Sequence, residues 1–71
     1  LRFVTQRITD MEILYEFISI GSIIRVAAVD PETGTEAIIQ GPASVGQETL
    51  KRNAANKLFY ILEKEKKSKA K

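Results

Sequence analysis

The fold is decided by residues 11–40, which read MEILYEFISIGSIIRVAAVDPETGTEAIIQ. Residues 11–20 and 23–29 are dense in β-branched and aromatic side chains, and this composition favours β-strands. The two residues between them, Gly21-Ser22, fit a type II′ hairpin turn, because glycine accepts the positive φ that its first central position needs. The sequence therefore predicts a tight antiparallel hairpin.

A second turn follows at residues 30–35, which read DPETGT. The aspartate can bond back to the turn backbone, the proline presets φ, and the glycine takes the left-handed position that closes the turn. This turn leads into a third strand over residues 35–40. We expect Ile20 to face Ile23 in the first hairpin and Asp30 to face Thr35 in the second.

This register collects one uncharged face across the three strands. It consists of Ile13, Tyr15, Phe17, Ile24, Val26, Ala28, Ala37 and Ile39. The two turns are predicted from separate residues, so their agreement on one apolar face supports a three-stranded meander.

The opposite face of the meander mixes apolar and charged side chains. It carries Leu14, Ile18, Ile20, Ile23, Ala27, Val29 and Ile38 together with Glu16, Arg25, Glu36 and Gln40. Such a face is too apolar to meet solvent in a monomer, and an ordered part of about 55 residues is marginal alone. We therefore expect a homodimer, and the candidate self-association surface is Leu14, Ile18, Ile23, Ile38 and Phe59.

A C-terminal helix follows the sheet. Gly41-Pro42 ends the third strand, and Ser44-Val45-Gly46-Gln47 has the form of a capping box, which predicts a helix from about Val45 to about Lys66. Its apolar side chains recur at helical spacing, so they form one stripe for the apolar face of the sheet. The stripe consists of Leu50, Ala54, Leu58, Ile61 and Leu62, widened by Ala55 and Phe59.

The expected organisation is one α+β domain, a three-stranded antiparallel β-meander packed against one C-terminal α-helix in the order βββα. The domain spans residues 11–66, and residues 67–71 form a lysine-rich tail. Residues 1–10 are either a flexible lead-in or a weak edge strand. We favour the lead-in, because Met11 begins the first clear element.

Composition excludes several classes of protein. The chain has 71 residues, 44 % of them hydrophobic, a formal net charge of +2, and neither cysteine nor histidine. Disulfides, thiolates and the usual transition-metal sites are therefore excluded, and no apolar run approaches the about 20 residues that cross a bilayer. We expect a cytoplasmic protein without cofactor, metal or membrane contact.

Catalysis has little support in the sequence. The best candidate is a carboxylate pair made of Glu16 with Glu36 or Glu12. Because Glu16 lies diagonal to Arg25 in the predicted register, the arginine would keep that carboxylate ionised. We expect a protein that is not an enzyme.

Nucleic-acid binding is the alternative function. Arg52, Lys57 and Lys64 are predicted to share a helix face, and the lysine tail would add charge. The competing interpretation is the ordinary solvent side of an amphipathic helix. Tyr15 and Phe17 could stack on bases if the sheet were open, but the helix needs that face, so we expect them in the core.

Five segments carry a family resemblance: YEFI at 15–18, DPETGTE at 30–36, GPAS at 41–44, NKL at 56–58 and YILEK at 60–64. Together they resemble a family of very short uncharacterised proteins from alphaproteobacteria, some of which carry a label of serine hydroxymethyltransferase. We expect that label not to apply, because a pyridoxal-phosphate enzyme needs several hundred residues and a deep cofactor pocket. The resemblance implies a bacterial cytoplasmic origin and assigns no function.

Overall fold

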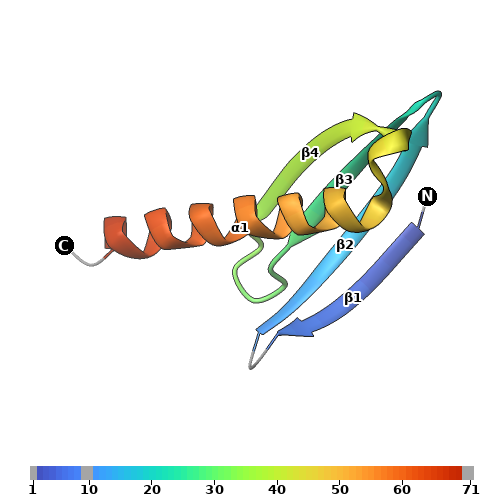
Figure 1. Ribbon diagram of the computed structural model, residues 1–71. Coiled ribbons are helices and arrows are strands. Elements are labelled where there is room, and N and C mark those ends of the chain that lie inside the picture. The colour runs from blue at the N-terminus through green and yellow to red at the C-terminus, as the bar shows by residue number, and fades with distance from the viewer. Residues whose placement is uncertain (1, 9–10, 70–71) are drawn as a thin grey trace.

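The computed structural model describes residues 2–8 and 11–69, which form a four-stranded antiparallel sheet with one long helix across one of its faces (Figure 1). The elements are β1 (Arg2–Ile8), β2 (Met11–Ile20), β3 (Ile23–Val29), β4 (Glu36–Pro42), the 3-10 turn η1 (Ala43–Val45) and α1 (Gln47–Lys69). The strands lie in chain order, β1-β2-β3-β4. The predicted α+β class and the C-terminal helix are confirmed, and the number of strands is wrong.

The extra strand is β1, so of the two interpretations of the first ten residues the favoured flexible lead-in is wrong over residues 2–8, and the edge strand is the one that the structure shows. β1 pairs antiparallel with β2 from Arg2 opposite Phe17 to Ile8 opposite Met11. Its sequence RFVTQRI lacks the strict apolar-polar alternation of a half-buried strand, because each face receives both apolar and polar side chains. Residues 1, 9 and 10 of the expected lead-in lie outside the described residues.

Both predicted turns are confirmed in position. Gly21 has φ +60°, and the ladder of β2 and β3 closes at Ile20 opposite Ile23. In the second turn the Asp30 carboxylate accepts hydrogen bonds from the Glu32 amide at 3.0 Å and from the Thr33 hydroxyl at 3.1 Å. Gly34 takes the left-handed conformation, with φ +78°. Glycine suits this position because it has no Cβ.

The predicted register of β2, β3 and β4 is confirmed as well. Phe17 lies opposite Val26, which lies opposite Ile39. One sheet face and the inner stripe of α1 therefore make the core. Its buried members are Ile13, Tyr15, Phe17, Ile24, Val26, Ala28, Ala37, Leu50, Ala54, Ala55 and Leu58, and the partly buried Val4, Met11, Ile39, Phe59, Ile61 and Leu62 pack against them.

The start of the helix differs from the predicted capping box. Ser44 lies inside η1 and not at the start of α1. Gly46 separates the two helical segments with φ +98°, and α1 begins at Gln47. The Gln47 side chain accepts a hydrogen bond from Arg2 Nη1 at 3.1 Å instead of closing on the serine. The helix backbone continues to Lys69, and residues 70 and 71 of the lysine-rich tail lie outside the described residues.

Small side chains set where α1 lies on the sheet. The helix packs mainly on β3 and β4, and its C-terminal part extends past the sheet (Figure 1). Ala28 and Ala37 line the sheet side of this contact, and Ala54 lines the helix side. At Gly41 an added Cβ would come 2.9 Å from Leu50 Cδ2. The absence of bulk at these positions lets helix and sheet approach closely.

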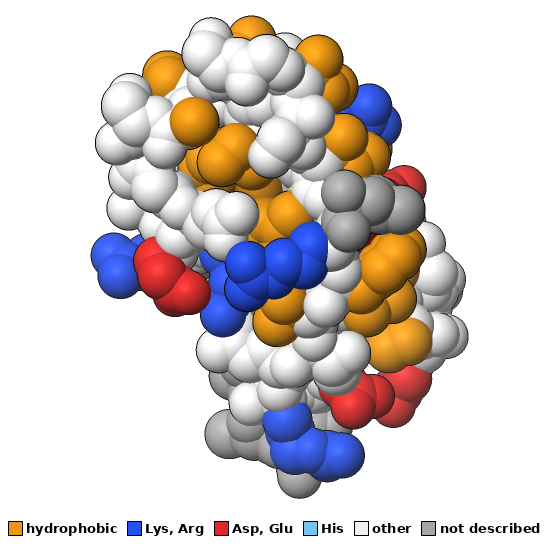
Figure 2. All heavy atoms as spheres, turned by 90° about the vertical axis from the view of Figure 1, so that its right-hand side faces the viewer, with side chains coloured by type: hydrophobic (Ala, Val, Ile, Leu, Met, Phe, Trp, Pro, Cys, Tyr) orange, Lys and Arg blue, Asp and Glu red, His pale blue; other side chains and the backbone are white. Residues whose placement is uncertain are grey.

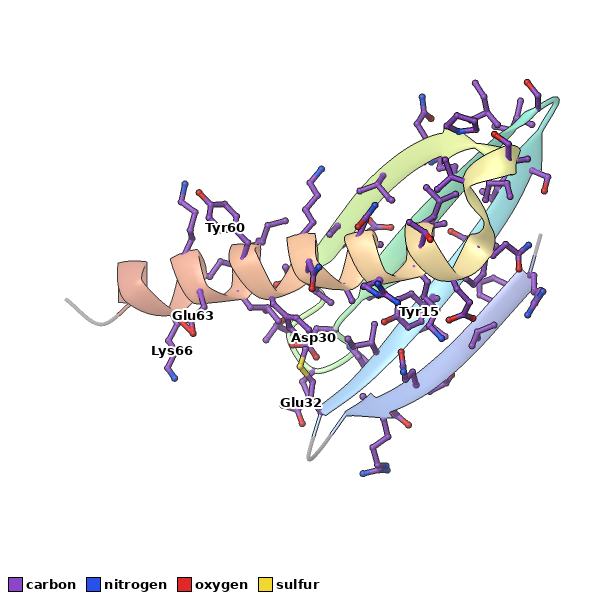
Figure 3. All side chains as sticks on the ribbon, viewed as in Figure 1. Tyr15, Asp30, Glu32, Tyr60, Glu63 and Lys66 are labelled. Carbon is purple, nitrogen blue, oxygen red and sulfur yellow. The ribbon has the colours of Figure 1, made fainter. Side chains whose placement is uncertain are left out.

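The β2 half of the core is filled by aromatic rings. Tyr15 is 1 % exposed and lies between α1 and the sheet (Figure 3). Its hydroxyl donates to Gln6 Oε1 on β1 at 3.1 Å. Burial raises the pKa of the Tyr15 phenol above its ordinary value of 10.0, and the negative charge of Glu48 raises it further.

We predict that Gly41→Ala lowers the free energy of unfolding by about 1–2 kcal/mol, because the new methyl group has to displace the buried Leu50 side chain. Chemical denaturation monitored by circular dichroism measures the change. The control is Gln40→Ala at the exposed neighbouring position, expected within about 0.5 kcal/mol of the original chain. Equal stability of the two variants would contradict the close approach.

We also predict that Tyr15→Phe changes how stability depends on pH. At neutral pH the variant loses the hydrogen bond to Gln6, worth about 1 kcal/mol. Above pH 10 the unfolded chain releases the tyrosine proton while the folded chain holds it, so the original protein loses stability as pH rises toward the raised pKa. The variant lacks this loss, and the two stabilities converge. Denaturation curves from pH 7 to 11 test this, and parallel curves would refute it.

Candidate functional site

The sheet face opposite α1 is covered by no other element in the described part of the chain, and we name it the open face. The ladder assigns to it Phe3, Thr5 and Arg7 from β1; Glu12, Leu14, Glu16, Ile18 and Ile20 from β2; Ile23, Arg25, Ala27 and Val29 from β3; and Glu36, Ile38, Gln40 and Pro42 from β4. α1 lies on the other side of the sheet, and β1 widens the open face by one strand instead of covering it.

Large apolar side chains on the open face are exposed to solvent. Phe3 is 60 % exposed, Ile20 57 %, Ile23 41 % and Ile38 37 %. Each comes from one of the four strands, so the exposure is spread across the whole sheet. Single exposed apolar residues are ordinary on a protein surface, but a contiguous set typically marks an interaction site.

Two opposite charges lie at the centre of the open face. Glu16 lies opposite Ala27 in the ladder, and two residues further along, Ile18 lies opposite Arg25. The four side chains form a two-by-two block in which the acid and the base occupy one diagonal and the apolar pair occupies the other. A two-fold rotation about the line from Ile18 to Ala27 exchanges the corners of Glu16 and Arg25. Two copies of the block related by this rotation therefore bring the acid of each near the base of the other.

A hollow borders one end of the open face. It has a volume of about 310 Å³ and is lined by Ser22, Ile23, Gln40, Gly41 and Pro42. It lies beside the exposed end of the first hairpin, so this end of the face has both protruding and recessed apolar surface.

A second surface lies in the other layer, where α1 leaves part of β1 and β2 uncovered. It is a groove of about 270 Å³, which we name the α1/β1 groove, lined by Gln6, Tyr15, Glu48, Lys51, Arg52, Ala55, Asn56 and Phe59. Lys51 Nζ lies 5.3 Å from the centre of the Tyr15 ring, and the Arg2 guanidinium lies 5.7 Å from that of Phe17. The long side chains cover the aromatic rings and keep their charges at the surface.

Positive charge prevails in and beside this groove. Arg2, Lys51 and Arg52 contribute three cations, against the one carboxylate of Glu48, whose nearest oxygen lies 4.0 Å from Lys51 Nζ. Figure 2, turned toward the side where β1 begins, shows basic side chains lying across hydrophobic ones. A ligand of this groove would need negative charge.

The two edges of the sheet differ. On the β4 edge, Lys57 Nζ donates to the Ile38 carbonyl at 3.0 Å, and a lysine at an edge discourages pairing with another strand. Among the described residues, no side chain is hydrogen-bonded to the backbone of β1. β1 and β4 are the outer strands of the sheet, and β2 lies inside it.

The structure brings together four of the five predicted self-association residues. Leu14, Ile18, Ile23 and Ile38 share the open face. Phe59 lies in the other layer, where it is partly buried against the core and lines the α1/β1 groove, so it is not part of the open face. Phe3 was missed, because its strand was read as a lead-in.

The three predicted nucleic-acid contacts do not lie together. Arg52 lines the α1/β1 groove, whereas Lys57 reaches across to β4 on the other side of the helix. Lys64 lies further along, with its Nζ 5.6 Å from the centre of the Tyr60 ring. Figure 3 shows Tyr60 directed away from the sheet. The expected single basic face is therefore divided.

The predicted carboxylates are separated too. On β2, Leu14 stands between Glu12 and Glu16 on the same side of the strand, and Glu36 lies on β4, two strands away. Within residues 2–8 and 11–69, no group of three or more Asp, Glu, His or Cys side chains could hold a metal ion. In the same part of the chain, no helix combines the length and the apolar character needed to span a membrane.

Comparison with known proteins gives one match, to a sequence family. Neither the curated proteins nor the solved structures contain a match. The family model covers residues 10–65, which include β2, β3, β4, η1 and most of α1, while β1 lies outside the matched range. The chain therefore belongs to the family described as Domain of unknown function (DUF6898).

Proposed function

We propose that this protein is a small non-catalytic interaction module that works as a homodimer, with the open face as its interface. The observation that carries the proposal is the exposure of large apolar side chains on all four strands of that face. A second copy is the occupant that this face fits best, for reasons of area and of charge. A bacterial cytoplasmic setting stays a prediction that rests on the family resemblance.

The area of the open face suits a dimer. Four strands with the usual spacing and about seven residues each make a plate of about 19 by 23 Å. Side-chain relief makes the accessible area larger than this projection, which brings it near the about 600 Å² per partner at the lower end of stable interfaces. Burial of this plate would supply the second core that a chain of this size needs.

The charges of the open face favour a second copy over an unrelated apolar surface. A two-fold axis along the diagonal of Ile18 and Ala27 brings Glu16 of each copy near Arg25 of the other. The two sheets then cross at a steep angle, as in the orthogonal class of sheet packing. Each buried charge meets an opposite one, so the interface leaves neither uncompensated.

The first test is the mass of the protein in solution. We expect twice the chain mass at micromolar concentration in sedimentation equilibrium, and a monomer for Ile38→Lys, which would bring lysines of both copies into an apolar interface. The matched control is Tyr60→Lys on the outer side of α1, also an exposed apolar residue, which should stay dimeric. A monomeric original chain, or equal effects of the two variants, would overturn the proposal.

The second test exchanges charges between copies. Glu16→Arg alone gives a surface with only positive charge at the block, and Arg25→Glu alone gives only negative charge, so each variant should be mainly monomeric. An equimolar mixture should form heterodimers, because each arginine then meets a glutamate of the other chain. Native mass spectrometry distinguishes the species. A mixture that stays monomeric would exclude this arrangement of the interface.

A further inference from the structure

We propose that the free edge of β1, together with the α1/β1 groove, binds an extended acidic peptide segment of another protein as a fifth strand. This inference does not depend on the homodimer, since it concerns the other layer and the outer edge of the sheet. Strand addition uses main-chain hydrogen bonds for affinity and alternate side chains for specificity.

The first argument is the difference between the two edges. A strand can add at β1 or at β4, because these are the outer strands of the sheet. At β4 the Ile38 carbonyl already accepts a hydrogen bond from Lys57 Nζ, and Pro42 has no amide to donate. β1 runs over seven residues without a proline. Among the described residues, β1 is therefore the edge at which no side chain occupies a pairing group and no proline interrupts the strand.

The second argument is the groove beside that edge. An added strand would direct every second side chain to the helix side of the sheet, next to Gln6, along the open side of the α1/β1 groove. The groups that it would meet there are mainly donors: the Lys51 ammonium, the Arg52 guanidinium and the Asn56 amide. Arg52 is exposed and has no carboxylate within ion-pair distance among the described residues.

The third argument is charge, and it selects the kind of strand. β1 contains two arginines and no acid, Arg2 on the helix side of the sheet and Arg7 on the open face, and the groove adds Lys51 and Arg52 against Glu48. Pairing of β1 with β1 of a second copy would bring arginines of both chains to one seam, where β1 supplies no acid and only Arg7 has one opposite it, Glu12 of β2, so this pairing is unfavourable. A segment with carboxylates at alternate positions matches the groove instead.

The aromatic rings of the groove argue against single-stranded nucleic acid as the occupant. Tyr15 and Phe17 are 1 % and 5 % exposed, and they are covered by the side chains of Lys51 and Arg2. Base stacking needs an accessible ring face. The covered rings therefore favour a peptide over single-stranded nucleic acid as the occupant.

The experiment measures fluorescence anisotropy with a labelled heptapeptide in which glutamate alternates with valine. We expect saturable binding, and binding about tenfold weaker when glutamine replaces glutamate or when the protein carries Arg52→Glu. Lys64→Glu is the matched control, an exposed cation of the same helix outside the groove, and should bind as the original chain does. Equal binding of the glutamate and glutamine peptides would overturn the acidic specificity.

Two N-methylated peptides test strand addition itself. In an added strand every second amide faces β1, and the amides between them point away from it. One peptide carries methyl groups on the amides that face β1, which blocks the hydrogen bonds to that strand, and the other carries them on the amides that point away. We expect one peptide to lose binding and the other to keep it. Equal binding of both peptides would overturn strand addition. Displacement of the glutamate peptide by an oligothymidylate, with the same dependence on Arg52, would show a general polyanion site and overturn the peptide assignment.

Discussion

The structure depends on a mismatch of widths between one helix and one sheet. A helix with its side chains is about 10 Å across, whereas four strands span about 19 Å. α1 can therefore cover about half of one face, and it covers the half made by β3 and β4. The single helix leaves the rest of the sheet uncovered. This uncovered part consists of the open face, the α1/β1 groove and the free edge of β1.

The side chains of the sheet are distributed to suit this partial cover. Under the helix, alanines and Gly41 keep the two layers close. Beside the helix, Tyr15 and Phe17 fill the space with their rings, and cationic side chains lie over those rings where a second helix would otherwise be needed. Burial of the aromatic residues is thus completed by lysine and arginine stems, so the same contacts that finish the core make the groove basic.

The sequence predicted those parts of the fold that are specified locally. Gly21 and the Asp30 turn each fix a hairpin from a few residues, and the two turns together determine the register and the composition of both sheet faces. β1 could not be predicted in this way. Its alternation of apolar and polar residues is mixed on both faces, and its side chains contact Phe17 and Tyr15 of β2 and the distant Gln47 of α1. The same holds for the helix start, where Gln47 bonds to Arg2 rather than to a capping serine.

The absence of β1 from the predicted sheet also limited how much of the candidate site the sequence predicted. Most of the open face follows from the register of β2, β3 and β4, so its aliphatic residues were predicted, but Phe3 and the groove require β1 to be in place. The division of the basic residues likewise follows from where α1 lies: Arg52 turns toward β1, and Lys57 turns toward β4.

Because the open face belongs to one layer and the groove to the other, occupation of one leaves the other accessible. A dimer joined through the open faces would still present two β1 edges, one from each copy, and a partner with two acidic segments could bind both at once. For such a partner the second segment would bind at a high effective concentration, so a weak single strand addition would be enough for a stable assembly.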